Sequence, residues 1–402
     1  MPAALLALLL RALLVLIGLA LVGVAFFSAV RTFVLPRSAP DPVVRVVFRG
    51  LRRGFNALTR RSRDYTEADA IMAFFAPTAL LALLPVWLLL IAAGYACLFW
   101  VVDEKTWYEA LVLSGSSLLT LGFARADGWV NVLLSFSEAV LGLMLVAILI
   151  AYLPTIYAAF SRREAAVSLL EVRAGSPPSA VEMILRFHRL HGLDRLSDLW
   201  PDWELWFTEI EESHTSLAAL VFFRSPKPER SWVTAAGAVL DAAALTNAVV
   251  DIPHDLQADL TIRAGFLALR SIADFFGLKY NPNPRPTDPI SITREEFDAA
   301  CDGMRAAGVP LKADREQAWR DFAGWRVNYD TVLVALALIT MAPYAPWSSD
   351  RTPEGVRSPL ELMQAKQLKR TGFARFSSSS STDPTRGRTS GTDGADGSIE
   401  AD

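Results

Sequence analysis

The chain has 402 residues, enough for two structural units, and 52% of them are hydrophobic. Its formal net charge of −3 provides no strong field for nucleic acid, so no nucleic-acid partner is expected. Mean hydropathy is +0.31, and most of the apolar excess lies before residue 160 in runs too long for a globular core, which excludes an ordinary soluble protein. We therefore expect an integral membrane protein.

Three apolar runs have the length of a membrane-spanning helix, for which about 20 residues suffice. Ala12–Val30 contains no charged residue, Ile71–Val102 contains none either, and Val130–Phe160 contains only Glu138. The first run is also open to interpretation as a cleaved signal peptide, although Met1–Leu10 lacks the positive charge that usually precedes one.

Arginines after the first run indicate the orientation. Arg31–Arg63 carries nine arginines and one acidic residue, Asp41, and such segments stay in the cytoplasm. This favours a retained transmembrane helix within residues 1–30, an external N-terminus and a basic cytoplasmic loop over residues 31–70. The third run then returns the chain, so the C-terminal region is expected in the cytoplasm of a multi-pass plasma (inner) membrane protein. The same arginines suit contact with anionic lipid, and Val43–Phe55 suits an interfacial amphipathic helix.

A half-length apolar segment follows the second run. As a helix, residues 107–119 would be about 20 Å long, too short to cross a hydrocarbon core of about 30 Å. Such a segment between two spans is typical of a re-entrant helix, with Trp107 and Tyr108 at the outer interface. The sequence Thr-Leu-Gly-Phe-Ala occupies residues 120–124 directly after it.

The order of helix, short acidic turret, half-length helix, Ser-Leu-Leu-Thr-Leu-Gly-Phe and second helix resembles the pore module of the potassium-channel superfamily. The resemblance covers residues 71–163, with residues 130–160 as the inner helix. It implies a homotetramer, because each chain supplies one loop, and a potassium or weakly selective cation channel with K⁺ as the permeant ion and no other metal or cofactor. The resemblance assigns the selectivity filter to Thr120, Leu121, Gly122, Phe123 and Ala124.

The filter departs from the family pattern at its outer end. Ala124 stands where the family has a second glycine, a position whose left-handed backbone costs other residues about 1–2 kcal/mol. Arg125 takes the place of the aspartate that normally follows, and the nearest aspartate is Asp127. Four arginines at a pore mouth would repel cations. These departures leave a second hypothesis open, in which the chain is a non-conducting, channel-like scaffold or sensor.

The third run contains three residues with alternative interpretations. Gly142 suits either the hinge of an inner helix or close helix packing. Pro154 suits either a gating kink or an ordinary bend. Glu138 either forms a hydrogen bond behind the filter, or extends toward the membrane surface or packs against Ser135 and Ser137.

Residues 164–345 are expected to form a helical cytoplasmic domain. Asp202–Phe222 has apolar residues at helical spacing, Ser231–Val250 is apolar nearly all round, and Thr293 with Glu296 forms a capping box. Nucleotide-sensing domains of this channel superfamily use a Gly-x-Gly-x-x-Gly unit or a β-roll, and the domain shows neither pattern, so no ligand is predicted for it. Its expected role is either to gate the pore or to aid assembly.

Chemical motifs in the cytoplasmic region are weak. No phosphate loop or catalytic triad is apparent, so no enzymatic activity is expected. His188-x-x-His191 suits either a metal site or, more simply, a surface pair, and Trp200, Trp203 and Trp206 suit a core better than a docking surface. Residues 346–402 are expected to form a linker and a disordered tail rich in serine, threonine, glycine and aspartate.

Overall fold

The computed structural model describes residues 2–35, 41–103 and 106–351 of the chain. Within these ranges every regular element is a helix, and one isolated β-bridge joins Val250 to Leu311. The all-α class expected from the sequence is confirmed. Among the described residues, three helices are long and apolar enough to cross a membrane, which supports a membrane-embedded protein.

The three long helices are α1 (Pro2–Phe33), α4 (Phe75–Asp103) and α6 (Trp129–Ala174). Helices α1 and α4 lie side by side, and they approach most closely where Gly18 faces Gly94. A Cβ atom on Gly18 would lie 2.7 Å from the Gly94 carbonyl oxygen, so both glycines are required for this close packing.

Two shorter helices connect α1 to α4. Helix α2 (Pro42–Thr59) contains the predicted amphipathic segment, and the Asp41 carboxylate caps it by accepting hydrogen bonds from the first backbone N–H groups. Helix α3 (Tyr65–Ala73) is followed by its C-cap Phe74, and α4 begins at Phe75. The single run predicted over 71–102 is therefore divided between two helices.

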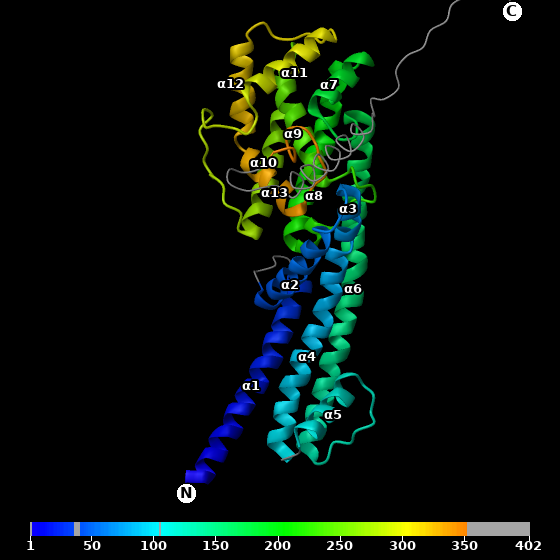
Figure 1. Cartoon of the computed structure of the whole chain (residues 1–402), viewed down its shortest axis with the longest axis vertical. Helices are drawn as coiled ribbons and strands as arrows, with labels where there is room; N and C mark the ends of the chain where they lie inside the picture. Colours follow the sequence, from blue (N-terminus) through cyan, green and yellow to red (C-terminus); the bar gives the residue numbers. More distant parts are fainter. Residues whose placement is uncertain (1, 36–40, 104–105, 352–402) are drawn as a thin grey trace, which may run out of the picture.

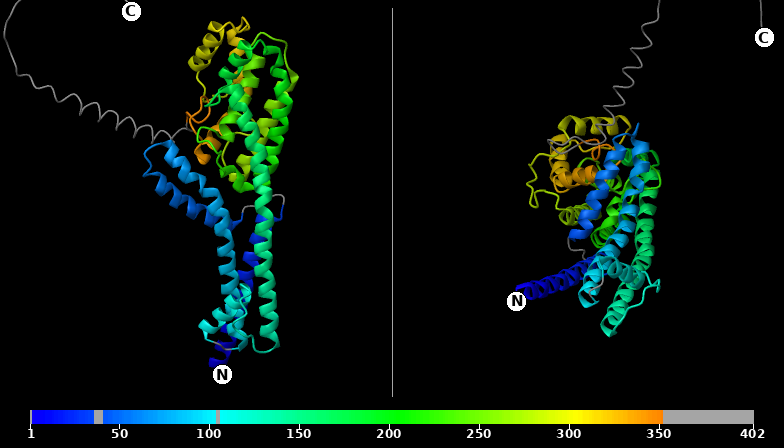
Figure 2. Two further views of the ribbon diagram at one scale, coloured as in Figure 1. Left: turned by 90° about the vertical axis from the view of Figure 1, so that its right-hand side faces the viewer. Right: turned by 60° about the horizontal axis from the view of Figure 1, so that its bottom comes forward.

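The molecule is elongated, with the long helices at one end and a compact C-terminal domain at the other (Figure 1). Helix α2 lies where the bundle meets the domain, and α5 (Trp107–Leu118) lies at the far end of the bundle beside α4 and α6. The side view shows α2, α3 and the start of α4 leaning away from α6 at the level of the domain (Figure 2). The basic segment and the C-terminal domain thus share one end of the bundle, and the N-terminus lies at the other.

The C-terminal domain packs around α9, every residue of which is buried, as expected for the apolar 231–250 segment. The predicted capping box of Thr293 and Glu296 is present. The predicted helix over 202–222 ends earlier, and its last residues form a 3₁₀ turn instead. The elements of the domain are α7 (Ala180–Arg189), η1 (Leu193–Leu199), α8 (Trp200–Ser216), η2 (Ala218–Phe222), α9 (Trp232–Ala248), α10 (Leu256–Phe276), α11 (Arg294–Ala306), α12 (Arg315–Arg326) and α13 (Asp330–Thr340).

Both expected boundaries of this domain differ from the structure. Helix α6 continues without a break past residue 163, and its Val167 and Leu170 side chains enter the domain core. At the other end, Trp347 and Ser348 are buried, and the Trp347 carbonyl oxygen accepts a hydrogen bond of 2.5 Å from the buried Arg326 guanidinium. The domain therefore extends to residue 351, and the remainder of the expected linker and tail, 352–402, lies outside the described residues.

Candidate functional site

Helix α5 begins at the end of the bundle that is farthest from the C-terminal domain (Figure 1). Its start is fixed by a capping box in which the Thr106 backbone N–H donates to Glu109 Oε2 at 2.9 Å and the Thr106 hydroxyl accepts from the Glu109 N–H. The Trp107 ring stacks on Trp100 of α4, with 5.3 Å between ring centroids. The first turn of α5 is thus anchored to the last turns of α4.

From this start α5 runs inward along the bundle. The Ser114 hydroxyl lies 3.1 Å from the Ala92 carbonyl oxygen of α4 and 2.5 Å from Glu138 Oε1 of α6. The end of α5 meets Gly142, where a Cβ atom would overlap the Leu118 carbonyl oxygen. Gly142 lies thirteen residues after Trp129, the first residue of α6. At about 1.5 Å per residue, α5 therefore ends roughly 20 Å along α6 from its start, inside the bundle.

The chain then returns through the loop of residues 119–128 to the start of α6. The loop is folded back on α5, since the Leu121 N–H donates to the Ser116 carbonyl oxygen at 2.8 Å and the Ala124 N–H donates to Ser116 Oγ at 3.1 Å. The side chains of Leu121 and Phe123 are 60% and 66% exposed in the single chain. The loop therefore presents two apolar side chains on the surface of the single chain.

Two filter residues have a left-handed backbone, and Ala124 is not one of them. The φ angle is +54° at Thr120 and +73° at Gly122. A β-branched residue such as threonine rarely adopts this conformation, at a cost on the order of 1–3 kcal/mol. The strain expected at Ala124 is absent, because the left-handed positions fall earlier in the loop. The left-handed residues of the loop are therefore Thr120 and Gly122, and not the residue for which the sequence predicted strain.

Glu138 lies behind the loop and is fully buried. One of its carboxylate oxygens faces Ser114 of α5, and within the described residues the other, Oε2, has no hydrogen-bond partner. Ser137 instead pairs with the Tyr95 hydroxyl of α4 at 2.8 Å. Of the two interpretations of Glu138, this geometry favours the hydrogen bond behind the filter.

The other candidate residues lie at different depths. Arg125 is exposed in the outer part of the loop, and the Asp127 carbonyl oxygen accepts a hydrogen bond from the Asn131 side chain at 3.0 Å. Pro154 lies inside α6, which continues through it, and is twelve residues beyond Gly142. The structure brings Gly142 together with the filter loop and leaves Pro154 distant from it.

Sequence reasoning missed the serines that hold the loop. Ser114 and Ser116 are buried and point to α6 and to the loop backbone, respectively. The sequence alone could have indicated that these serines form hydrogen bonds, because hydroxyl groups inside an apolar half-length helix need partners at membrane depth. Their partners, however, come from other helices and could not be identified from spacing along the chain.

The structure assigns no ligand to the histidine pair or to the tryptophans that the sequence singled out in the C-terminal domain. Among the described residues, no group of three or more His, Cys, Asp or Glu side chains is placed to hold a metal ion, and His188 and His191 gain no third partner. Trp200, Trp203 and Trp206 are buried in the core, in line with the core interpretation. Scans against family models and searches of curated proteins and of solved structures find no match to the chain.

Proposed function

We propose that the protein is a cation channel whose pore is formed by four copies of the loop at residues 119–128. The observation that carries this proposal is the path of α5, which enters from one end of the bundle and ends roughly 20 Å inside it, before the chain returns. Non-helical backbone at membrane depth is tolerated only where it is buried in protein or lines a water-filled cavity. The loop satisfies the Gly115, Ser116 and Ser117 carbonyl groups of α5 itself, and a water-filled pore would accommodate the remaining polar groups of the loop backbone.

Electrostatics favour a cation at this point. The C-terminal end of a helix carries a partial negative charge, and α5 directs that end toward the middle of the bundle. Carbonyl groups of the loop would replace the hydration shell of the ion. The left-handed backbone of Thr120 and Gly122 supports this assignment, because strained backbone is concentrated at functional sites.

A homotetramer is supported by the apolar surface that one chain leaves exposed. Residues on one side of α6 are 39–69% exposed and recur every three or four positions, the spacing of helix-packing seams. With the exposed Leu121 and Phe123, this surface suits neighbouring copies around a central axis. The α6 residues are Leu133, Phe136, Val140, Leu143, Val146, Ile150, Leu153 and Tyr157.

The proposed orientation follows from the position of the arginines. Helix α2 and the C-terminal domain share one end of the bundle, and basic segments next to spanning helices remain in the cytoplasm. We therefore assign this end to the cytoplasm and the end with α5 to the outside of the plasma membrane. The filter loop then opens to the external solution, as a pore loop requires.

Flux measurement tests the channel proposal. Full-length protein in liposomes with a K⁺ gradient is expected to conduct, and Gly122→Ala should reduce the flux at least tenfold. A side chain at φ +73° costs about 1–2 kcal/mol in each of four copies. Gly54→Ala is the control, since a Cβ atom at Gly54 meets nothing within 4 Å and α2 lies at the other end of the bundle from the loop. It should keep flux within about twofold of the parent chain.

Absence of Gly122-sensitive flux, or a monomer in mild detergent, would contradict the channel proposal. The second candidate, a non-conducting scaffold or sensor, is favoured by the exposed Arg125 directly after Ala124. The double variant Ala124→Gly, Arg125→Asp separates the two functions. A channel of low selectivity conducts before and after this change, whereas a non-conducting scaffold gains K⁺ flux only in the variant.

A further inference from the structure

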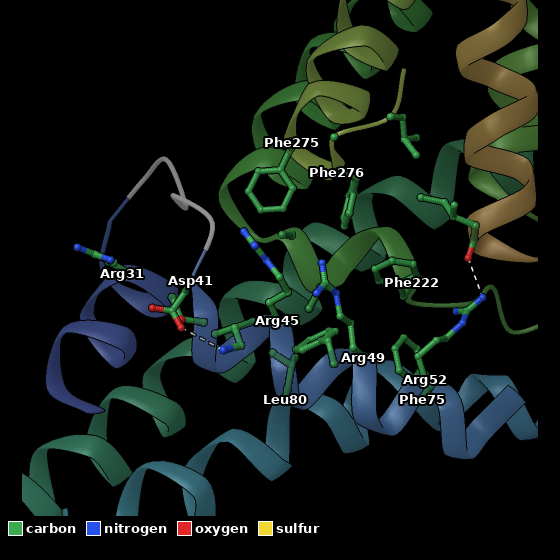
Figure 3. Close-up of a pocket in the computed structure, with 18 of the residues that line it drawn as sticks. Arg31, Asp41, Arg45, Arg49, Arg52, Phe75, Leu80, Phe222, Phe275 and Phe276 are labelled. Carbon is green, nitrogen blue, oxygen red and sulfur yellow. Dashed lines mark hydrogen bonds between the residues drawn. The ribbon is translucent and has the colours of Figure 1, made fainter. Parts of the chain in front are cut away.

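A cavity of about 830 Å³ lies where α2, the inner ends of the long helices and the C-terminal domain meet. Its wall on the membrane side includes Phe75 and Leu80 of α4, both buried. Its wall on the domain side includes Phe222 of η2 and Phe275 and Phe276 of α10 (Figure 3). The cavity is thus apolar on two sides and has the volume of a small-molecule site.

Arginines line the side formed by α2 and the last turn of α1. Arg45 and Arg49 are one helical turn apart on α2, and Figure 3 shows both between the aromatic walls of the cavity. Arg31 and Arg53 also line it, and all four are exposed. Within the described part of the chain, none of these four guanidinium groups forms an ion pair. We call this site the arginine cavity.

The two acidic residues of the arginine cavity have other partners. The Asp41 carboxylate accepts a 2.8 Å hydrogen bond from Ser28 and caps α2. Asp274 accepts a 3.1 Å hydrogen bond from the Tyr280 hydroxyl. Among the described lining residues, five arginines therefore face two carboxylates that are already engaged, which gives this lining an excess of positive charge.

The fifth arginine, Arg52, fixes the shape of the cavity. Its guanidinium donates a 2.8 Å hydrogen bond to the Ile339 carbonyl oxygen of α13 and lies over the Phe75 and Phe222 rings, at 5.2 and 5.7 Å. Burial and the nearby Arg224 lower the Arg52 pKa to about 10. Arg52 thus connects α2 to the domain, while the other four arginines remain available to a ligand.

We propose that the arginine cavity binds an anionic phospholipid from the leaflet next to the C-terminal domain, with its phosphate on Arg45 and Arg49 and an acyl chain against the aromatic walls. Charge complementarity and the apolar walls together require an amphiphile rather than a free anion. The arginine side of the cavity is exposed at Arg31, Arg45 and Arg49, so a charged headgroup can reach it from the surface. Helix α2, which lines the cavity, lies at the end of the apolar helices, the level expected for lipid headgroups.

Such a lipid would contact the spanning helices, α2 and the C-terminal domain at once. A ligand that binds only when these parts are together stabilises that arrangement by mass action. The bound lipid therefore acts as a structural bridge between membrane and domain. This role does not depend on whether the protein conducts ions.

Native mass spectrometry of the purified full-length protein tests the proposal. Phosphatidylglycerol and phosphatidylcholine of equal chain length are titrated separately, and phosphatidylglycerol is expected to bind at least tenfold more tightly. The variant Arg45→Gln, Arg49→Gln should weaken phosphatidylglycerol binding by about 30-fold, since each arginine near a membrane surface contributes about fivefold. The variant Arg61→Gln, Arg63→Gln makes the same charge change in the same basic segment outside the cavity and should leave binding unchanged.

Three outcomes would overturn the proposal. Equal binding of both lipids removes the anionic preference, and equal weakening in both double variants shows diffuse attraction to the basic segment. Displacement of the lipid by millimolar inorganic phosphate identifies a free-anion site instead. Apparent melting temperatures in neutral lipid verify that each variant is folded. Because no ion flux is measured, failure here is distinct from failure of the channel proposal.

Discussion

Gly142 shows how a single residue positions the candidate pore loop. Its missing side chain leaves room for the Leu118 carbonyl oxygen at the end of α5, and the neighbouring Ser114–Glu138 contact holds α5 to the same helix. The contact supports the packing interpretation of Gly142 over a hinge. A residue that must stay in contact with α5 restricts how far α6 can bend at that point.

Replacement of Gly142 by alanine should therefore destabilise the bundle. The added Cβ overlaps backbone, and overpacking of this kind costs about 1–3 kcal/mol. We expect the apparent melting temperature in detergent to fall by several degrees. Gly115→Ala is the control, because a Cβ there meets nothing within 4 Å and alanine favours a helix interior. Unchanged stability together with altered channel opening would support a hinge instead.

At the scale of elements, the joint between α6 and α8 connects membrane and domain. Arg163 of α6 is buried, and its guanidinium donates to the Leu220 and Phe223 carbonyl oxygens at 2.9 and 2.7 Å. It also lies 3.2 Å from Nε2 of the buried His214 of α8, whose other ring nitrogen is 3.1 Å from Ser213 Oγ. Burial first, and the charge of Arg163 second, lower the His214 pKa well below its ordinary value.

This joint should weaken in mild acid. His214 stays neutral in the folded protein, whereas in the unfolded chain it takes up a proton below about pH 6.5. The free energy of unfolding therefore decreases as the pH is lowered below that value, by up to about 1.4 kcal/mol per pH unit. We expect the melting temperature to drop between pH 7.5 and 5.5, and the drop to be smaller in His214→Gln. The exposed His191→Gln should keep the parental slope. Equal slopes in all three chains would exclude His214 as the cause.

Elements with a strong local pattern could be predicted, and contacts between them could not. The apolar runs, the buried α9 and the Thr293 capping box each depend on neighbouring residues. The break between α8 and η2 and the docking of α2 depend on distant ones. Arg52, for example, bonds to Ile339, 287 positions away, and nothing in the basic segment indicates that partner. The candidate loop was located by its sequence, but its backbone angles depend on Ser116 and α6.

At the scale of the whole molecule, the two ends carry different chemistry. The filter loop and the N-terminus lie at one end, and the arginines of α2 and the C-terminal domain lie at the other (Figure 1). Because an excess of arginine and lysine usually marks the cytoplasmic side, this asymmetry is the basis of the orientation that we propose. The proposed topology can be tested without reference to ion flux.

Cysteine labelling provides that test. In a chain whose buried Cys97 and Cys301 are changed to alanine, Arg125→Cys should react with a membrane-impermeant maleimide in intact cells. Ser197→Cys, exposed in η1, should react only after the membrane is permeabilised. The reverse pattern would place the domain outside and invalidate the assignment.

Helix α6 connects the two ends of this asymmetric molecule. Its 46 residues form a rod about 69 Å long, with one end in the core of the C-terminal domain and the other beside the filter loop. The helix is continuous between these ends, and Gly142 within it contacts the Leu118 carbonyl oxygen at the end of α5. A displacement of the domain end of α6 would therefore be carried through a single helix to the contact that positions the loop.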